Sequence, residues 1–385
     1  MNNWQKNILY ILLSAILYFV IFIEILPKLL SNSTNLFQGD KYVIIVGDFQ
    51  SNNSFGKQVL TGFKKAYYKA YYNKPYFKYI KVNIDESLVE NVTGTIKSET
   101  RLLKKHVEKE LIKIISTKNV ISIISANTSQ TIEAVLNVGK TFNIPVLITV
   151  STKESLSNKY KNIYFRLLAD NNKQGKAIIK WAKKFLNLKN STCGVLYSPT
   201  KYGYDLLQSL RSSLGNDGYI KIIPFSISTT TDIVGSLKYG KSLGVSSWVS
   251  LSYLSESIEI MAKKNRIDTI NPILFSDGAY GLWLEKLKVQ NEKVFLSFPK
   301  TYNNKSGIKD VKGFGVFGYD AFFIIHDCIT NDIDKSTSKS SFIIKIANYN
   351  NSNIENRNTI QTYRFVNGEN INSNFKIYSI KNDLP

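Results

Sequence analysis

The feature that most constrains the fold of this chain is a regular alternation of short β-branched runs with amphipathic helical segments. Between residues 41 and 150 the apolar runs are KYVIIVGD (41–48), FKYIKVNI (77–84), NVISIIS (119–125) and IPVLITV (144–150). The segments between them carry apolar residues at helical spacing, at 55–72, about 98–117 and 129–142. This β-α-β-α-β-α-β order predicts a parallel sheet covered by helices on both faces.

A second series of the same kind follows a polar break near residues 166–175. Its expected helices cover 175–188 and 204–215, and its expected strands cover 191–198, 219–227, 246–253, 272–278 and 293–299. A chain of 385 residues also exceeds the usual size of one domain. We therefore expect two α/β lobes, each built around its own sheet.

Six residues, GFGVFG (313–318), fit the G-x-G-x-x-G pattern of a dinucleotide-binding turn. Such a turn joins the first strand and helix of a β-α-β unit. Here the preceding residues, TYNNKSGIKDVK, are polar and contain no buried strand. We therefore expect the glycines to lead into a helix at 319–329 that returns the chain to the first lobe, rather than to bind a nucleotide.

The N-terminus carries an apolar segment that includes the uncharged run ILYILLSAILYFVIFI (8–23). From residue 7 to residue 30 this segment is long enough to cross a bilayer. An uncleaved anchor is favoured over a signal peptide, because no A-x-A site follows the run and no lipid-accepting Cys is present. Both interpretations place the rest of the chain outside the cytoplasm, in the periplasm or at the cell surface.

The formal net charge is +21, from 50 basic and 29 acidic residues. No long Lys/Arg run concentrates this charge, so lysines spread through an Asn-, Lys- and Ile-rich composition are favoured over a nucleic-acid footprint. Cys193, Cys328, His106 and His326 show none of the spacings of a zinc site. We therefore expect no nucleic-acid partner, no metal and no cofactor, and buried free thiols are favoured over a Cys193–Cys328 disulfide.

Hydroxyl-rich loops follow two neighbouring strands of the first series. SANTSQT (125–131) leads from one strand into a helix, and VSTKES (150–155) follows the next strand. Ligands bind at the carboxyl ends of parallel strands, where backbone N–H groups and hydroxyls can hold a carboxylate. Ordinary helix caps are the alternative for each loop, and both interpretations stay open.

The second series offers complementary groups at the equivalent edge. Asp277, in ILFSDGAYG, follows a strand and could accept hydrogen bonds from a ligand ammonium. Tyr202 and Tyr253 also follow strands, and their rings could wall a ligand. The alternatives are an Asp-Gly turn residue and surface tyrosines in a chain that has 23 of them.

Residues that could carry catalysis are missing from the expected strand-end loops. The sequence has no Gly-x-Ser-x-Gly elbow and no phosphate-binding lysine loop, and neither histidine follows a strand. His326 is expected to be a packing residue inside its helix. We therefore expect no catalytic residue and no enzyme activity.

The order of these motifs from residue 41 to residue 381 resembles the type I periplasmic binding proteins. The resemblance is to the branch that includes leucine/isoleucine/valine-binding proteins and the ligand-binding regions of receptors. It is carried by VGDFQSNNSFGKQVLTGFKKA, ISANTSQTIEAV, NIPVLITVSTKESL, YFRLLADNNKQGKAIIKW, CGVLYSPTKYGYDLLQSL, ILFSDGAYG, GFGVFGYDAFFI and RFVNGENINSNFKIYSI. The resemblance implies an α/β fold of two Rossmann-like lobes, each a parallel sheet flanked by helices, joined by a three-segment hinge with a ligand cleft between them.

The resemblance also implies a division of the chain. Residues 1–30 would be the anchor or signal segment and 31–40 a polar spacer. Lobe 1 would comprise 41–165 and 301–345, lobe 2 would comprise 166–300, and 346–385 would contain the final hinge crossing.

The resemblance assigns ligand contacts residue by residue. Ser125, Thr128 or Ser129 would bind the ligand α-carboxylate, Ser151 and Thr152 would add donors to it, and Asp277 would pair with the α-ammonium. The tyrosines expected to line the cleft are Tyr202, Tyr253 and Tyr319. Asp277 is one methylene shorter than the Glu of some members, and Ser125-Ala126 stands where the family usually has Gly.

The implied function is that of an extracytoplasmic solute-binding protein for an amino acid or similar zwitterion, acting by hinge closure. Its expected partners are the small-molecule ligand, an ABC-type permease or a sensor in the membrane, and the membrane itself through the N-terminal helix. A membrane-tethered sensory or regulatory domain and a degenerate scaffold that binds nothing are the alternatives.

Overall fold

The computed structural model describes most of the chain beyond residue 39. The described residues are 40–50, 54–71, 76–85, 96–154, 156–186, 191–215, 220–281, 283–287, 293–301, 310–330, 338–351 and 358–381. The expected anchor and most of the spacer lie outside them. No helix among the described residues is both long enough and apolar enough to span a bilayer.

Seven strands of the described residues form the sheet of the first lobe, in the order β11-β12-β5-β4-β3-β1-β2. Neighbours from β12 to β2 pair in parallel, and β11 pairs antiparallel to β12. The bounds are β1 Tyr42–Gly47, β2 Lys78–Asn83, β3 Val120–Ser125, β4 Val146–Ile148, β5 Tyr164–Arg166, β11 Phe365–Val366 and β12 Glu369–Asn370. All six residues of β3 are buried, as expected for a central strand covered on both faces.

The second lobe contains a six-stranded sheet of described residues in the order β13-β10-β9-β8-β6-β7. Only β13 runs antiparallel to its neighbour in this sheet. The bounds are β6 Ser191–Tyr197, β7 Ile220–Ser226, β8 Ser247–Leu251, β9 Ile273–Phe275, β10 Val294–Pro299 and β13 Phe375–Ser379. The prediction of two α/β lobes, each with its own mostly parallel sheet, is confirmed.

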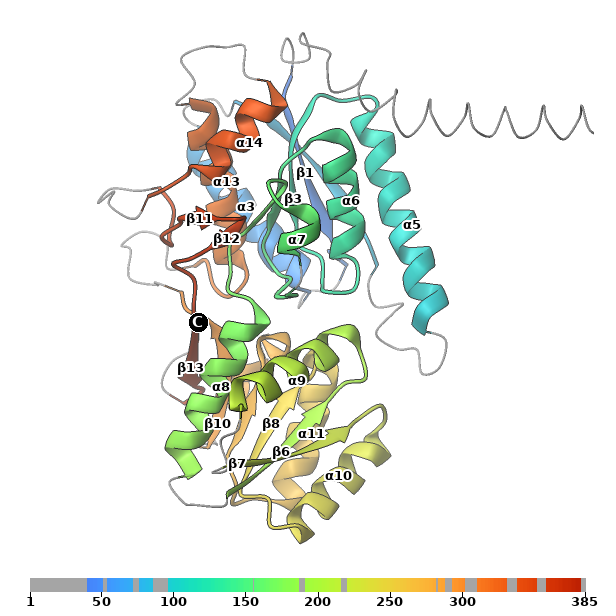
Figure 1. Cartoon of the computed structure of the whole chain (residues 1–385), viewed down its shortest axis with the longest axis vertical. Coiled ribbons are helices and arrows are strands. Elements are labelled where there is room, and N and C mark those ends of the chain that lie inside the picture. The colour runs from blue at the N-terminus through green and yellow to red at the C-terminus, as the bar shows by residue number, and fades with distance from the viewer. Residues whose placement is uncertain are drawn as a thin grey trace, which may run out of the picture.

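Helices cover both sheets, as Figure 1 shows. Those of the first lobe are α3 Phe55–Tyr71, α5 Ile96–Ile115, α6 Ile132–Phe142, α7 Ser157–Tyr160, α13 Gly315–Thr330 and α14 Lys339–Ala347. Those of the second lobe are α8 Asn171–Leu186, α9 Lys201–Leu214, α10 Thr230–Ser242, α11 Leu254–Ile267, α12 Trp283–Leu287 and the 3-10 turn η2 Asp277–Ala279. Helix α8 starts four residues before its expected start at 175. The prediction missed this first turn because its residues are polar and lack the apolar spacing that marks the rest of the helix.

The glycines of GFGVFG allow two helices of the first lobe to touch through their backbones. A Cβ added to Gly62 of α3 would lie 1.8 Å from the carbonyl oxygen of Gly315, and one added to Gly318 would lie 2.0 Å from that of Val59. Gly313 has φ +57°, a left-handed conformation that favours glycine. These glycines therefore allow the chain to turn and helices α3 and α13 to pack closely. This agrees with the expectation that they lead into a helix of the first lobe.

Three chain segments connect the lobes (Figure 1). The first runs from β5 to α8, the second from β10 toward α13, and the third from β12 to β13. Cys193 lies in β6 and Cys328 in α13, in different lobes, and both are buried and free, as expected. His326 stacks on Phe322 with ring centroids 5.6 Å apart, which agrees with the expected packing role.

Candidate functional site

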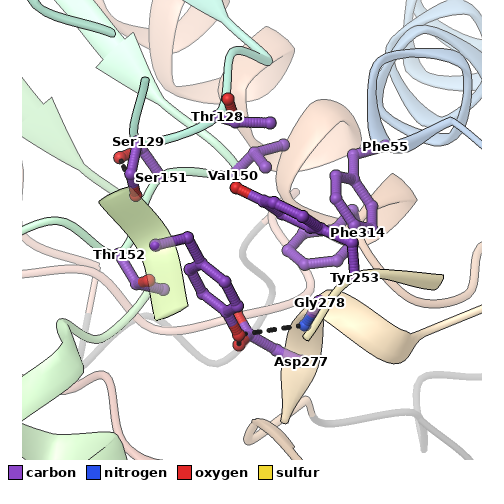
Figure 2. Close-up of a pocket in the computed structure, with 11 residues that line it drawn as sticks. Phe55, Thr128, Ser129, Val150, Ser151, Thr152, Tyr253, Asp277, Gly278 and Phe314 are labelled. Atoms are coloured by element: carbon purple, nitrogen blue, oxygen red, sulfur yellow. Dashed lines mark hydrogen bonds between the residues drawn. The ribbon is translucent and has the colours of Figure 1, made fainter. Parts of the chain in front are cut away.

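A small cavity lies between the lobes, at the carboxyl ends of strands from both sheets (Figure 2). The first lobe contributes residues from the loops after β3 and β4, and the second lobe contributes residues at the starts of α9, α11 and η2. The lining residues are Phe55, Thr128, Ser129, Val150, Ser151, Thr152, Tyr202, Tyr253, Asp277, Gly278 and Phe314. This position is where an open parallel sheet is expected to bind a ligand.

The two hydroxyl loops of the first lobe give part of the cavity a polar but uncharged lining. Thr128 and Ser129 precede α6, whose N-terminus is the positive end of the helix dipole. The Ser129 and Ser151 hydroxyl oxygens lie 3.3 Å apart, so the two hydroxyl loops meet. Hydroxyls, backbone N–H groups and a helix N-terminus together suit a ligand carboxylate.

The second-lobe side presents a buried carboxylate. Asp277 is 3% exposed, and its Oδ1 accepts hydrogen bonds from the Tyr202 hydroxyl at 2.5 Å and from Gln174 Nε2 at 2.8 Å. The Tyr202 oxygen in turn accepts from the Gly278 N–H at 3.2 Å. Burial raises the pKa of Asp277, and the hydrogen bonds from Tyr202 and Gln174 oppose that rise. Burial, reinforced by Asp277, raises the pKa of the Tyr202 hydroxyl, so that group remains a donor.

Aromatic rings close the cavity. The rings of Tyr202 and Tyr253 are stacked, with their centroids 5.0 Å apart. The ring centroid of Phe55 lies 6.5 Å from that of Tyr253 and 4.9 Å from that of Phe314. This series of rings runs from the second lobe to the first, so the cavity wall depends on the lobes being close together. Figure 2 shows Phe55, Phe314 and Tyr253 along one side and the hydroxyls of Ser129, Ser151 and Thr152 along the other.

Seven of the predicted site residues line the cavity, namely Thr128, Ser129, Ser151, Thr152, Tyr202, Tyr253 and Asp277. Ser125 and Tyr319 do not line it. Ser125 is fully buried at the end of β3 and donates a hydrogen bond to Asn127 Oδ1 at 3.0 Å, inside the loop. Tyr319 lies in α13, where its hydroxyl accepts from Lys69 Nζ at 3.3 Å and its ring packs on Phe323.

Besides Val150 and Gly278, which adjoin predicted residues in the chain, sequence reasoning missed four residues of this region. Phe55 starts the helix that follows the first strand, so its position at that helix N-terminus was a usable signal. Phe314 stands between two glycines and reaches the cavity only because α13 docks on α3, which local sequence does not show. Gln174 contacts Asp277 from the polar first turn of α8.

Asn171, the fourth, is fully buried and its backbone N–H donates to the Thr152 carbonyl at 2.9 Å. Its side-chain amide has no hydrogen-bond partner among the described residues. An unpaired buried amide costs roughly 1–3 kcal/mol. We therefore expect a water molecule or a ligand group beside it when the site is in use.

The geometry defines a two-lobed binding protein with a cleft for a small molecule. A family model described as the receptor family ligand binding region matches residues 32–238, more than half of the chain. The chain therefore belongs to this family of type I periplasmic binding proteins. A search of the curated proteins found no match.

Solved structures share the fold over nearly the whole chain. A leucine binding protein of Thermotoga maritima is 19% identical, with a TM-score of 0.69, and covers 90% of this chain and 98% of its own. A branched-chain amino acid substrate binding protein of Streptococcus pneumoniae, in complex with isoleucine, is 14% identical, with a TM-score of 0.63 and coverage of 88% and 100%. An ABC transporter solute binding protein of R. palustris, in complex with benzoate, is 12% identical, with a TM-score of 0.70 and coverage of 90% and 94%.

Proposed function

We propose that this protein is a non-enzymatic, extracytoplasmic solute-binding protein whose lobes close on an amino acid or a similar small zwitterion. The observation that carries the proposal is the opposition of two kinds of group across one cavity. Uncharged hydroxyl donors lie on the first lobe, and the Asp277 carboxylate lies on the second. A zwitterion that bridges them gains contacts in the closed state that the open state lacks, so binding shifts the hinge toward closure.

The charges of the lining favour a zwitterion over a simple anion. Asp277 is the one charged side chain among the residues that line the cavity. A carboxylate ligand without an ammonium, such as the benzoate bound by the R. palustris protein, would leave that acid unpaired and repel it. An ammonium beside Asp277 pairs with the acid and compensates part of its desolvation.

The location and partners are part of the proposal. The apolar segment at 7–30 supports a tether that holds the binding lobes outside the cytoplasm. Solved neighbours described as ABC transporter binding proteins support a permease as the partner. A tethered sensory domain is the second candidate, because a permanent anchor suits a protein that stays with one partner.

The identity of the ligand is open to direct chemical analysis. Full-length protein, purified without added solutes and then denatured, should release a small molecule that carries both an ammonium and a carboxylate. Mass spectrometry of the supernatant identifies it, and the protein-free final wash is the control. Release of a molecule that lacks an ammonium would contradict the zwitterion proposal.

Binding should weaken as the pH falls. The pKa of Asp277 is raised by burial, so in ligand-free protein this acid becomes protonated at a pH above the ordinary range of an Asp. Protonation removes the charge that pairs with an ammonium, whereas a zwitterion keeps its own charges down to roughly pH 3. Calorimetric titrations with the released ligand between about pH 4 and pH 8 should show affinity falling toward acid. A flat profile would argue against an ionised Asp277 in the complex.

A further inference from the structure

Arg166 is a fully buried cation near the ligand cavity that does not line it. It ends β5, directly before the first connection between the lobes, and its side chain is 1% exposed. Its Nη2 donates to Glu369 Oε1 at 2.8 Å, and the Tyr164 hydroxyl donates to the same oxygen at 2.8 Å. A buried arginine is costly to desolvate unless it is paired, so this position calls for an explanation.

Glu369 is brought to Arg166 by the β11–β12 hairpin of the first-lobe sheet, directly before the third connection. Strands β11 and β12 are joined by Asn367 and Gly368, both at positive φ, as a tight two-residue hairpin requires. The Arg166 N–H donates to the Gly368 carbonyl at 2.7 Å, which sets β12 beside β5. The ion pair therefore lies within the first lobe and joins the two strand ends from which the first and third connections leave.

The other end of the guanidinium reaches a ligand loop. Arg166 Nη1 donates to the Lys153 carbonyl at 2.5 Å, one residue beyond Thr152 of the cavity wall. The Lys153 ammonium forms a 2.5 Å ion pair with Glu133 in the first turn of α6. The main chain that follows Ser151 and Thr152 is thus fixed by Arg166 on one side and by α6 on the other.

We propose that Arg166 is a positioning residue that holds the Ser151–Thr152 loop in its binding conformation, and that Glu369 of β12 fixes the guanidinium for this role. The shape of the carboxylate-binding side then depends on an ion pair inside the first lobe, at the strand ends that lead into the first and third connections. The effect of this role on ligand binding rests on the proposed function. The conformational stability of the loop can be measured without any ligand.

Hydrogen exchange of ligand-free, full-length protein provides that measurement. Arg166→Met and Arg166→Lys should raise the exchange rate of the backbone amides of residues 150–154 about tenfold or more relative to the β3 peptide. In the wild type the loop can open only if the hydrogen bond from Arg166 to the Lys153 carbonyl breaks, and the variants lack that bond. Glu369→Gln, which keeps an acceptor but loses the charge, should produce a smaller rise. Arg101→Met, at an exposed arginine of α5 in the same lobe, is the matched control and should change nothing.

The outcomes separate positioning from general stability. A rise at 150–154 that only parallels a rise in β3 would show that Arg166 merely stabilises the lobe, and would overturn the proposal. If Arg166→Met does not fold, the exchange of residues 150–154 in Arg166→Lys and Glu369→Gln provides the same test. Using the amino acid that the wild type binds, Arg166→Lys should weaken affinity roughly 2- to 30-fold, the range for residues that act through others. If loop exchange rises in the variants but neither they nor the wild type bind any amino acid, the proposed function is contradicted and the positioning role of Arg166 is not.

Discussion

Asp277→Asn should weaken the binding of a zwitterionic ligand by at least about 100-fold, because it removes the one negative charge that can pair with a buried ammonium. Asparagine keeps an oxygen that can accept from Tyr202 and Gln174, so the wall of the cavity should persist. Calorimetry measures the loss, and Asp310→Asn, which changes a carboxylate that is 90% exposed, is the control. Unchanged affinity in Asp277→Asn would remove Asp277 from the site.

The same substitution should not destabilise the ligand-free protein. Burial raises the pKa of Asp277, so the folded state binds a proton more tightly than the unfolded state does. Such a group adds stability below its unfolded pKa and loses that contribution as pH rises through the folded pKa. At neutral pH the buried carboxylate is therefore a net cost, and the free energy of unfolding of Asp277→Asn should equal or exceed that of the wild type. Lower stability would mean that the acid is structural.

Gly318→Ala should destabilise the fold by at least about 3 kcal/mol, although alanine is the better helix former. The added Cβ would lie 2.0 Å from the Val59 carbonyl oxygen, which is backbone of α3 and cannot rotate away. Helices α3 and α13 would have to separate, and Phe55 and Phe314 would lose their contact in the cavity wall. Chemical denaturation of the ligand-free protein measures the change.

Gly235→Ala is the matched control for that experiment. Gly235 lies inside α10, and an added Cβ would meet nothing within 4 Å. There the helix propensity of alanine should act alone and stabilise the protein by roughly 0.5–1 kcal/mol. Wild-type stability in Gly318→Ala would show that the two helices have room to separate, and would contradict the packing role of the glycines.

The fold was readable from sequence where local physics decides it. Strands such as β1 and β3 are continuous β-branched runs because both faces of a parallel sheet are buried, so their bounds agree with the prediction to within one residue. The three-residue strand β5 was not predicted, because it is too short to show a sequence pattern and is defined by its pairing with β4 and β12. Strands as short as this depend on contacts that the sequence pattern does not record.

The site divides in the same way. Thr128, Ser151 and Asp277 follow strands, and a strand end is a position that sequence alone reveals. Phe314 could not be chosen over Tyr319 from the sequence, since the two are five residues apart and only the docking of α13 on α3 decides which one meets the cavity. Contacts made by the first turn of α8 were hidden for the same reason.

We propose that the cleft selects a molecule with both an ammonium and a carboxylate. Calorimetric titration of the full-length wild type with each of the common L-amino acids, and with benzoate, tests this selectivity. We expect at least one amino acid to bind, and its analogue lacking the amino group, like benzoate, to bind at least about 100-fold more weakly. Binding of benzoate or of the deaminated analogue as tight as that of every amino acid would contradict it.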